Sequence, residues 1–446
     1  MSEDFRVIIV GGSVAGLTLA HSLERLGISF QVLEKNDDIS PQIGASIGIL
    51  PNGARILDQL GLFGAIEKEV EPMKTARISY PDGFTFQSDF PSSWEKSFGY
   101  PAAFLERQKF LEILYSKLQH KERVHTGQKV VSICYEKSTV IVKTASGDEY
   151  SADLVVGADG VHSTVRSEMW KHMAGVKPGI STASNSSALK LEYACIYGIS
   201  SQVPEIEAGV WYNLLDKQLT LHFIGVAGGR VFWFLIVKPE KEHWHADRQY
   251  LTEDETRRIC ERLGSKRLSP TLTFGDIWSR CDIFKMTPLE EGWFKTWHFH
   301  RLVIMGDAVR KMAPSIGQGA NMAIEDAAVL ANAIWKAGLG SSKFDTSAME
   351  LKIEGVLRHY STSLRTRTRQ MCDRSEFLVR LQTHDGLIKR ILARYVIPLL
   401  GDVPASLSAK SIQAAPLLEF IDIPARSCQD TRVFSPAQRR WFPCSS

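Results

Sequence analysis

Three acidic residues, Glu34, Asp159 and Asp307, each stand just past a short apolar run that is typical of a buried strand. An ionised carboxylate only accepts hydrogen bonds, so in this position it suits the hydroxyl groups of a sugar or polyol. One such residue is often structural. Three of them, widely separated in sequence, indicate one composite binding site that the fold must assemble.

The first carboxylate belongs to a glycine motif. The apolar run Phe5–Val10 enters GGSVAG, in which Gly11, Ser13 and Gly16 occupy the three fingerprint positions of a dinucleotide-binding turn. Strand, turn, helix and a second strand ending in Glu34 predict a βαβ unit, with pyrophosphate at the helix N-terminus and ribose at Glu34. Ser13 replaces the usual second glycine and still permits close backbone approach. The charge of Glu34 repels a 2′-phosphate and therefore favours FAD or NAD over NADP.

The third carboxylate opens a similar arrangement near residue 300. After Asp307 the chain passes through Pro314 and the loop Gly317–Ala320 into a long amphipathic helical pattern. Helix N-termini present unpaired N–H donors and attract negative charge. A ligand that meets both a polyol acceptor and these donors is hydroxylated and electron-rich, as a flavin dinucleotide is. Pro314 and Ser315 are then expected to form the floor of a reaction chamber.

The remaining elements must position these turns. We expect a hairpin around Asp82, a helix over Phe104–Gln119 with Arg107 near its start, and antiparallel strands in Lys129–Val142 and Glu149–Val156. Ser163 is predicted to cap the helix after Asp159. The fold class is α/β, a Rossmann-type FAD-binding domain with an inserted β-sheet substrate domain and a helical C-terminal extension. The expected segments are FAD-binding 1–75, 104–177 and 291–370, substrate-domain 76–103 and 178–290, and the C-terminal extension 371–446.

Composition excludes several classes. The chain of 446 residues has 44% hydrophobic and 23% charged residues and a net charge of +3, which gives no case for nucleic acid as a partner. Its seven cysteines form no CxxC pair, so we expect reduced thiols, no metal site and an intracellular enzyme. No secretory signal and no apolar run of about 18 residues is found. The expected location is cytoplasmic or peripherally membrane-associated.

Two stretches leave alternatives open. Gly386–Leu400 places apolar residues on one face and Lys389, Arg390 and Arg394 mostly on the other. We expect a helix that packs on the flavin domain, with a membrane-surface helix as the alternative. In the aromatic strands between residues 191 and 237, Tyr212 is the candidate for a catalytic acid, although a packed sheet aromatic is the simpler interpretation.

The motifs GGSVAGL, GADGVHSTVR and VIMGDAVRKMAPSIGQGANMAIEDA together resemble the three flavin motifs of the group A FAD-dependent monooxygenases, the family of para-hydroxybenzoate hydroxylase. LEKN, IGASIGILPNGARILDQLGL, FLERQKFLEIL and RYVIPLLGDVP are most similar to fungal paxilline-pathway-like secondary-metabolite epoxidases. The resemblance covers about residues 5–420. Many relatives also carry a C-terminal membrane span, which is not found here.

The resemblance implies roles for individual residues. Gly11 and Gly16 would serve the pyrophosphate and Glu34 the adenosine ribose, while Arg107 would reach the FAD. Asp159 would support the pyrophosphate and is also linked to NAD(P)H. The remaining cofactor contacts would come from Gly48 in a loop beside the flavin, Asp307 at the ribityl chain, and Gly317 to Ala320 beside the pyrimidine ring. Ala320 stands where glycine is common.

The resemblance also implies a reaction. NAD(P)H, as a transient co-substrate, would reduce the flavin, and O₂ would add at C4a to give a hydroperoxide that transfers oxygen. The leading hypothesis is epoxidation of an alkene in a lipophilic isoprenoid, meroterpenoid or polyene. Aromatic hydroxylation of a phenol is second, and a base beside the phenol would favour it. A flavin-binding protein without catalysis is third. Substrate, nicotinamide preference and oligomeric state are left open.

Overall fold

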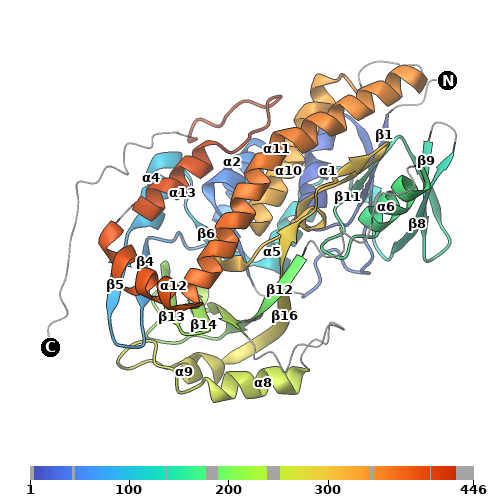
Figure 1. Cartoon of the computed structure of the whole chain (residues 1–446). Helices are drawn as coiled ribbons and strands as arrows, with labels where there is room; N and C mark the ends of the chain where they lie inside the picture. Colours follow the sequence, from blue (N-terminus) through green and yellow to red (C-terminus); the bar gives the residue numbers. More distant parts are fainter. Residues whose placement is uncertain are drawn as a thin grey trace.

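The computed structural model describes residues 5–42, 46–136, 139–176, 189–238, 252–340, 346–401 and 403–427. Two large sheets are bridged by helices, and the long helix α11 (Thr346–Gln382) runs across the molecule (Figure 1). The expected segment boundary at 177/178 and the end of the C-terminal tail lie outside the described residues.

The first sheet has six strands in the order β17-β18-β11-β1-β2-β7. Every neighbouring pair is parallel except β17 with β18. Its central strands are almost completely buried, as expected where helices or a second sheet cover both faces. The strands are β1 (Arg6–Val10), β2 (Ser29–Leu33), β7 (Val124–His125), β11 (Leu154–Gly157), β17 (His298–Phe299) and β18 (Leu302–Ile304).

Helices pack around this sheet. Helix α1 packs on α10, and α10 in turn contacts α2 and α11, so α10 is buried along nearly its whole length. The helices are α1 (Val14–Arg25), α2 (Pro51–Gln59), α3 (Phe63–Glu67), α5 (Arg107–Ser116), α6 (Thr164–Val176) and α10 (Gly319–Lys336), with the short helix η1 (Lys121–Arg123). A three-stranded meander of β8 (Val130–Glu136), β9 (Thr139–Thr144) and β10 (Glu149–Ala152) packs beside α6.

The second sheet has eight strands in the order β19-β16-β12-β15-β14-β13-β4-β5, all antiparallel except the pair β13–β4. Helices α8 (Glu253–Arg262) and α9 (Phe274–Trp278) lie below it in Figure 1. The strands are β4 (Thr75–Ser79), β5 (Thr85–Ser88), β12 (Leu189–Ser200), β13 (Val210–Asp216), β14 (Leu219–Gly225), β15 (Val231–Val237), β16 (Cys281–Trp293) and β19 (Arg310–Lys311). Helix α4 (Phe90–Phe98) and η2 (Ala227–Gly229) accompany it, and the pair β3 (Ser46–Ile49) with β6 (Ala103–Glu106) joins the two sheets.

The observed architecture confirms the predicted α/β class and the hairpin at residues 81–83. Several local expectations were wrong. The strand expected over residues 149–156 is two strands in different sheets, because the chain leaves β9 at Asp153 and pairs with β1. The expected helix at 104–119 begins only at Arg107, after β6. The expected domain boundaries stay predictions: those at 290 and 370 would fall inside β16 and α11, and the segment 76–103 contains α4 as well as strands.

The C-terminal part continues from α11 into α12 (Leu387–Ile391), a π-helical turn (Leu392–Val396), η7 (Ile397–Leu400) and α13 (Val403–Gln413). The expectation that the apolar face of Gly386–Leu400 packs on the flavin domain was wrong. Ala393 is buried against Tyr80 on the β4–β5 hairpin, whereas Leu387 and Ile388 are exposed. Gly386, with a positive φ, lies at the turn between α11 and α12.

Candidate functional site

The first glycine turn lies between β1 and α1. Gly11 has a φ of +106°, and a Cβ there would lie 2.4 Å from the carbonyl oxygen of Ala158. A Cβ on Gly16 would lie 1.9 Å from the carbonyl oxygen of Gly11. Both positions therefore require glycine so that the turn, the helix and the end of β11 can approach each other. The N-terminus of α1 consequently opens onto a cavity.

Ser13 and Arg107 meet at this turn. The Nη2 of Arg107 donates to the Ser13 hydroxyl at 2.8 Å. Burial lowers the pKa of Arg107, and nearby Tyr197, Asp307 and Glu34 oppose that shift, so the side chain is a guanidinium at neutral pH. The serine that replaces the fingerprint glycine thus holds a cation beside the N-terminus of α1.

Glu34 is buried at the end of β2. Its Oε2 accepts from the Gly12 N–H at 2.7 Å, and its Oε1 accepts from the backbone and side-chain N–H groups of Asn36 at 3.0 and 2.7 Å. These bonds fix the carboxylate at the edge of the cavity, next to Gln128 and Lys129.

Asp159 follows β11. Its carboxylate accepts from the Ser163 hydroxyl at 2.5 Å and from the backbone N–H groups of Thr164 and Val165 at 2.7 and 3.1 Å. Ser163 accepts from the Arg166 N–H at 2.9 Å, so its predicted capping role is confirmed and is shared with Asp159. The acid therefore shapes the turn that faces the cavity, and its expected role in supporting the pyrophosphate stays a prediction.

Asp307 lies in the short helix η4 (Gly306–Ala308) after β18. It forms an ion pair with Lys311, and this pairing raises the pKa of the lysine. A residue of α10 holds this turn in place: Asp326 accepts from the Gly306 N–H at 2.7 Å and pairs with Arg310 at 2.9 Å. Arg310 and Asp326 are 2% and 0% exposed, which makes this a fully buried ion pair.

The glycine loop before α10 is tied to β3 by one amide. Asn321 donates to the carbonyl oxygens of Gly317 at 2.7 Å and Gly48 at 3.0 Å, and it accepts from the Leu50 N–H at 3.0 Å. Gly317 has a φ of +61° and ends the short helix η5 (Pro314–Ile316). The predicted residues Gly48, Gly317 and Ala320 are thereby brought to one wall.

All these turns line one cavity of about 730 Å³. It extends from Glu34 past the first glycine turn, Arg107 and Asp307 to the loop at Gly317. Among the described residues, the buried hydroxyl groups of Ser46 and Ser315 have no hydrogen-bond partner, and both line the same space, as expected if a polar ligand completes them. The donor set, the acidic ends and the volume fit FAD.

Tyr212 is not among the residues that line this cavity, which favours the simpler interpretation, a packed sheet aromatic, over a catalytic acid. Its ring stacks on Phe223 at 4.7 Å, its oxygen accepts from the Glu207 N–H at 3.3 Å, and it lies in the core between the second sheet and helices α8 and α9. Strand residues alternate between faces, and its neighbour Trp211 is the one that lines the cavity.

Sequence reasoning missed His222 and Lys311. His222 on β14 lines the cavity, is hydrogen-bonded to Asn213, and burial lowers its pKa to about 4. A polar residue inside the apolar run LTLHFIG is the signal that could have found it, because buried polar groups need partners. Lys311 carried no comparable signal, since its pairing with Asp307 depends on how the chain turns at η4.

We predict that Tyr212→Phe keeps its FAD and its substrate-dependent oxidation of reduced nicotinamide within about twofold, because only one hydrogen bond is lost outside the cavity. Flavin absorbance and nicotinamide oxidation measure this. A variant that binds FAD and no longer turns over would return Tyr212 to the catalytic machinery.

Comparison with known proteins decides the family. Residues 4–345 match the family described as FAD binding domain. The chain belongs to this family. It is 53% identical over 427 residues to the FAD-dependent monooxygenase terM of Tolypocladium album, which covers 96% of this chain and 89% of the relative. It is 43% identical over 438 residues to the FAD-dependent monooxygenase paxM of Penicillium paxilli, covering 98% and 91%.

A solved structure agrees on the fold. A variant form of Klebsiella pneumoniae HpxO, complexed with FAD, superposes with a TM-score of 0.73 at 20% identity and covers 92% of this chain and 99% of that one. The family resemblance, the FAD cofactor and the monooxygenase class are therefore confirmed. This member of the FAD binding domain family is an FAD-dependent monooxygenase.

Proposed function

We propose that this monooxygenase epoxidises an alkene of a lipophilic isoprenoid, meroterpenoid or polyene, using O₂ and NADH or NADPH. The observation that carries the proposal is the apolar part of the cavity wall. Trp211, Ile224 and Phe234 of the second sheet line the cavity there, together with Phe104. Such a wall suits a hydrocarbon chain and excludes water from the reacting end.

The turns would hold FAD as follows. The N-terminus of α1 and Arg107 suit the pyrophosphate, Glu34 the adenosine ribose, and Asp307 the ribityl hydroxyls. The backbone N–H groups of Gly317 to Ala320, at the N-terminus of α10, suit the negative charge of a reduced ring. When bound, FAD supplies the redox chemistry, accepting a hydride from the nicotinamide and activating O₂.

Proton chemistry separates the proposal from its alternative, hydroxylation of a phenol. Two basic groups that line the cavity, His222 and Lys311, do not suit a phenol base. His222 has a pKa of about 4 and is neutral but weakly basic at pH 7. Lys311 is held protonated by Asp307, which raises its pKa. This supports an alkene, whose epoxidation requires no substrate deprotonation.

A lipophilic substrate of this kind partitions into membranes. We therefore include peripheral contact with a membrane surface in the proposed function, with the nicotinamide and O₂ arriving from the aqueous side.

The test offers the FAD-loaded full chain two probes under isotopically labelled O₂. One probe is an indole that bears a polyprenyl chain, and the other is para-hydroxybenzoate. We expect nicotinamide oxidation and a product one labelled oxygen heavier only with the prenylated probe, with loss of an alkene signal by NMR. Labelled catechol formation from the phenol, with the alkene probe untouched, would overturn the proposal.

A further inference from the structure

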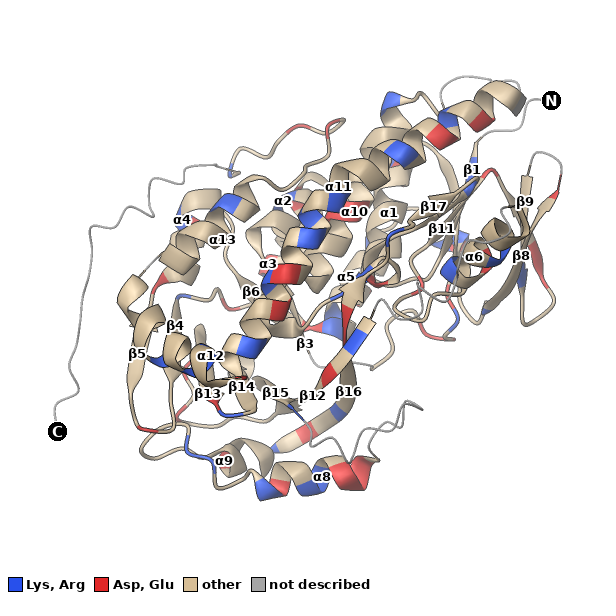
Figure 2. Ribbon diagram, in the orientation of Figure 1, with Lys and Arg blue, Asp and Glu red and all other residues tan. Residues whose placement is uncertain are grey.

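The chain exposes an apolar surface between α12 and α13. Six of its large side chains are 47–82% exposed, and we call them the C-terminal apolar patch: Leu387, Ile388, Ile391, Tyr395, Leu399 and Leu407. In Figure 2 this part of the ribbon is mostly tan, whereas α11 carries charged residues along its length. Clustered exposed apolar groups of this size mark an interaction surface.

The segment beneath the patch is firmly packed. The Tyr80 hydroxyl donates to the Ala393 carbonyl oxygen at 2.6 Å. Arg394 donates to Asp82 at 2.8 Å, and its guanidinium lies 3.8 Å from the centre of the Phe84 ring. The exposed side chains therefore project from an ordered platform on the β4–β5 hairpin.

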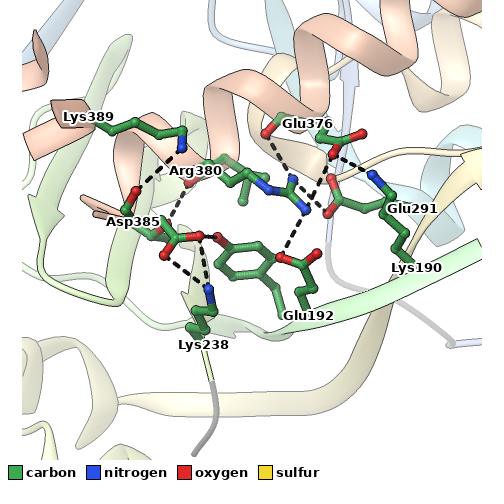
Figure 3. A network of polar contacts seen from close by, with 11 residues as sticks. Lys190, Glu192, Lys238, Glu291, Glu376, Arg380, Asp385 and Lys389 are labelled. Atoms are coloured by element: carbon green, nitrogen blue, oxygen red, sulfur yellow. Dashed lines mark hydrogen bonds and ion pairs between the residues drawn. The ribbon is translucent and has the colours of Figure 1, made fainter. Parts of the chain in front are cut away.

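A polar network fixes the turn that leads into the patch (Figure 3). Arg380, near the end of α11, pairs with Glu192 at 3.0 Å and Glu291 at 3.3 Å. Asp385 accepts from the Tyr193 hydroxyl and from Lys238, both at 2.9 Å. These contacts join α11 to β12, β15 and β16, so α12 starts from a rigid base.

The charge around the patch is positive. Residues 386–407, which span the patch, contain Lys389, Arg390 and Arg394 and one acidic residue, Asp402, and so carry a net charge of +2. Two acids at its edge, Asp82 and Asp385, are paired with Arg394 and Lys238. Arg390 is exposed. Apolar side chains with cations at their edge are complementary to an anionic lipid surface.

The geometry favours lying on a bilayer over crossing it. In the described residues no single helix is long and apolar enough to cross a membrane; Leu387–Leu400 and Val403–Gln413 reach that composition together but are bent by 81°. A span needs about 20 residues in line, whereas a bent pair can place its exposed side chains at the headgroup level.

We propose that the C-terminal apolar patch seats this enzyme on anionic phospholipid bilayers. Its use in delivering substrate rests on the proposed lipophilic substrate. Ala393, at the base of the patch, packs with Leu215, and Leu215 lies on the same face of β13 as Trp211 at the cavity wall. The membrane-contacting element thus lies on the same side of the second sheet as the substrate end.

The test is co-sedimentation of the full FAD-loaded chain with vesicles of phosphatidylcholine, with and without phosphatidylserine. We expect stronger binding to the phosphatidylserine vesicles. The double substitution Leu387→Ser with Ile388→Ser should lower partitioning about 100-fold, since each buried side chain contributes roughly tenfold. Arg390→Gln should weaken only the phosphatidylserine component. Leu351→Ser, at a residue that is 75% exposed outside the patch, is the matched control and should bind as the unchanged chain does.

Two results would overturn the inference. One is equal sedimentation of the unchanged chain and the double variant. The other is a concentration-dependent dimer that the double variant abolishes without a change in vesicle binding, which would make a second copy the partner. Flavin absorbance and nicotinamide oxidation with a soluble probe should not change in the double variant, so a failure of the proposed reaction is read separately from a failure of membrane binding.

Discussion

Asp307→Ala is expected to fold and to lose most of its FAD. The carboxylate follows β18 at the midpoint of the cavity, where the ribityl hydroxyls of FAD would need an acceptor. A hydrogen bond to a charged group contributes ~1.5–3 kcal/mol, so the Kd for FAD should rise roughly ten- to a hundred-fold. Lys311 also loses its partner and brings an uncompensated positive charge to the cavity. Flavin absorbance after gel filtration, with far-UV circular dichroism for the fold, measures the effect.

Two further variants make this result specific. Asp307→Asn keeps an oxygen acceptor without the charge and should retain an intermediate amount of flavin. Glu350→Ala, which removes a carboxylate that is 59% exposed on α11, should bind FAD as the unchanged chain does. Stoichiometric flavin in Asp307→Ala at normal fold would move the ribityl contact to another residue.

Short-range patterns were sufficient to predict the glycine and acidic turns that line the cavity. Gly11, Gly16 and Glu34 belong to one βαβ unit, in which spacing along the chain determines position in space. Gly317 and Asp307 were found in the same way, from a strand, a turn and a helix in sequence. In each case the elements that position the residue are its chain neighbours.

The cavity wall that the second sheet contributes could not be predicted from the sequence in this way. Tyr212 and His222 lie on antiparallel neighbours, and the face that each occupies depends on register and on which side of the sheet the flavin domain covers. The C-terminal segment shows the same limit, because its amphipathic pattern identified two faces and did not tell which one would be buried. Only the contact with the β4–β5 hairpin, more than 300 residues earlier, decides it.

Long-range polar contacts join helices α2, α10 and α11. Asn52 on α2 donates to Gln318 at 2.9 Å and to Glu325 at 2.7 Å, and Glu325 pairs with Arg367 of α11 at 2.6 Å. The Gly317 loop is thus connected to α11, the helix that leads to the C-terminal apolar patch. A substitution at one of these residues would shift the position of the loop without removing a ligand contact.

The largest effect on stability is expected at the buried pair below Asp307. Removing one partner of a buried ion pair leaves an uncompensated charge and costs roughly 3–5 kcal/mol. Asp326→Ala leaves Arg310 unpaired and also removes the acceptor of the Gly306 N–H. We expect a thermal midpoint several degrees lower and weaker FAD binding, because the Gly306 turn loosens.

Arg310→Met with Asp326→Leu, which removes both charges, should recover a large part of the loss. Glu354→Ala breaks the exposed pair with Arg358 and should cost less than about 1 kcal/mol. The explanation by compensation of buried charge would be contradicted if Asp326→Ala had the same thermal midpoint as the unchanged chain. It would also be contradicted if the double variant were less stable than Asp326→Ala.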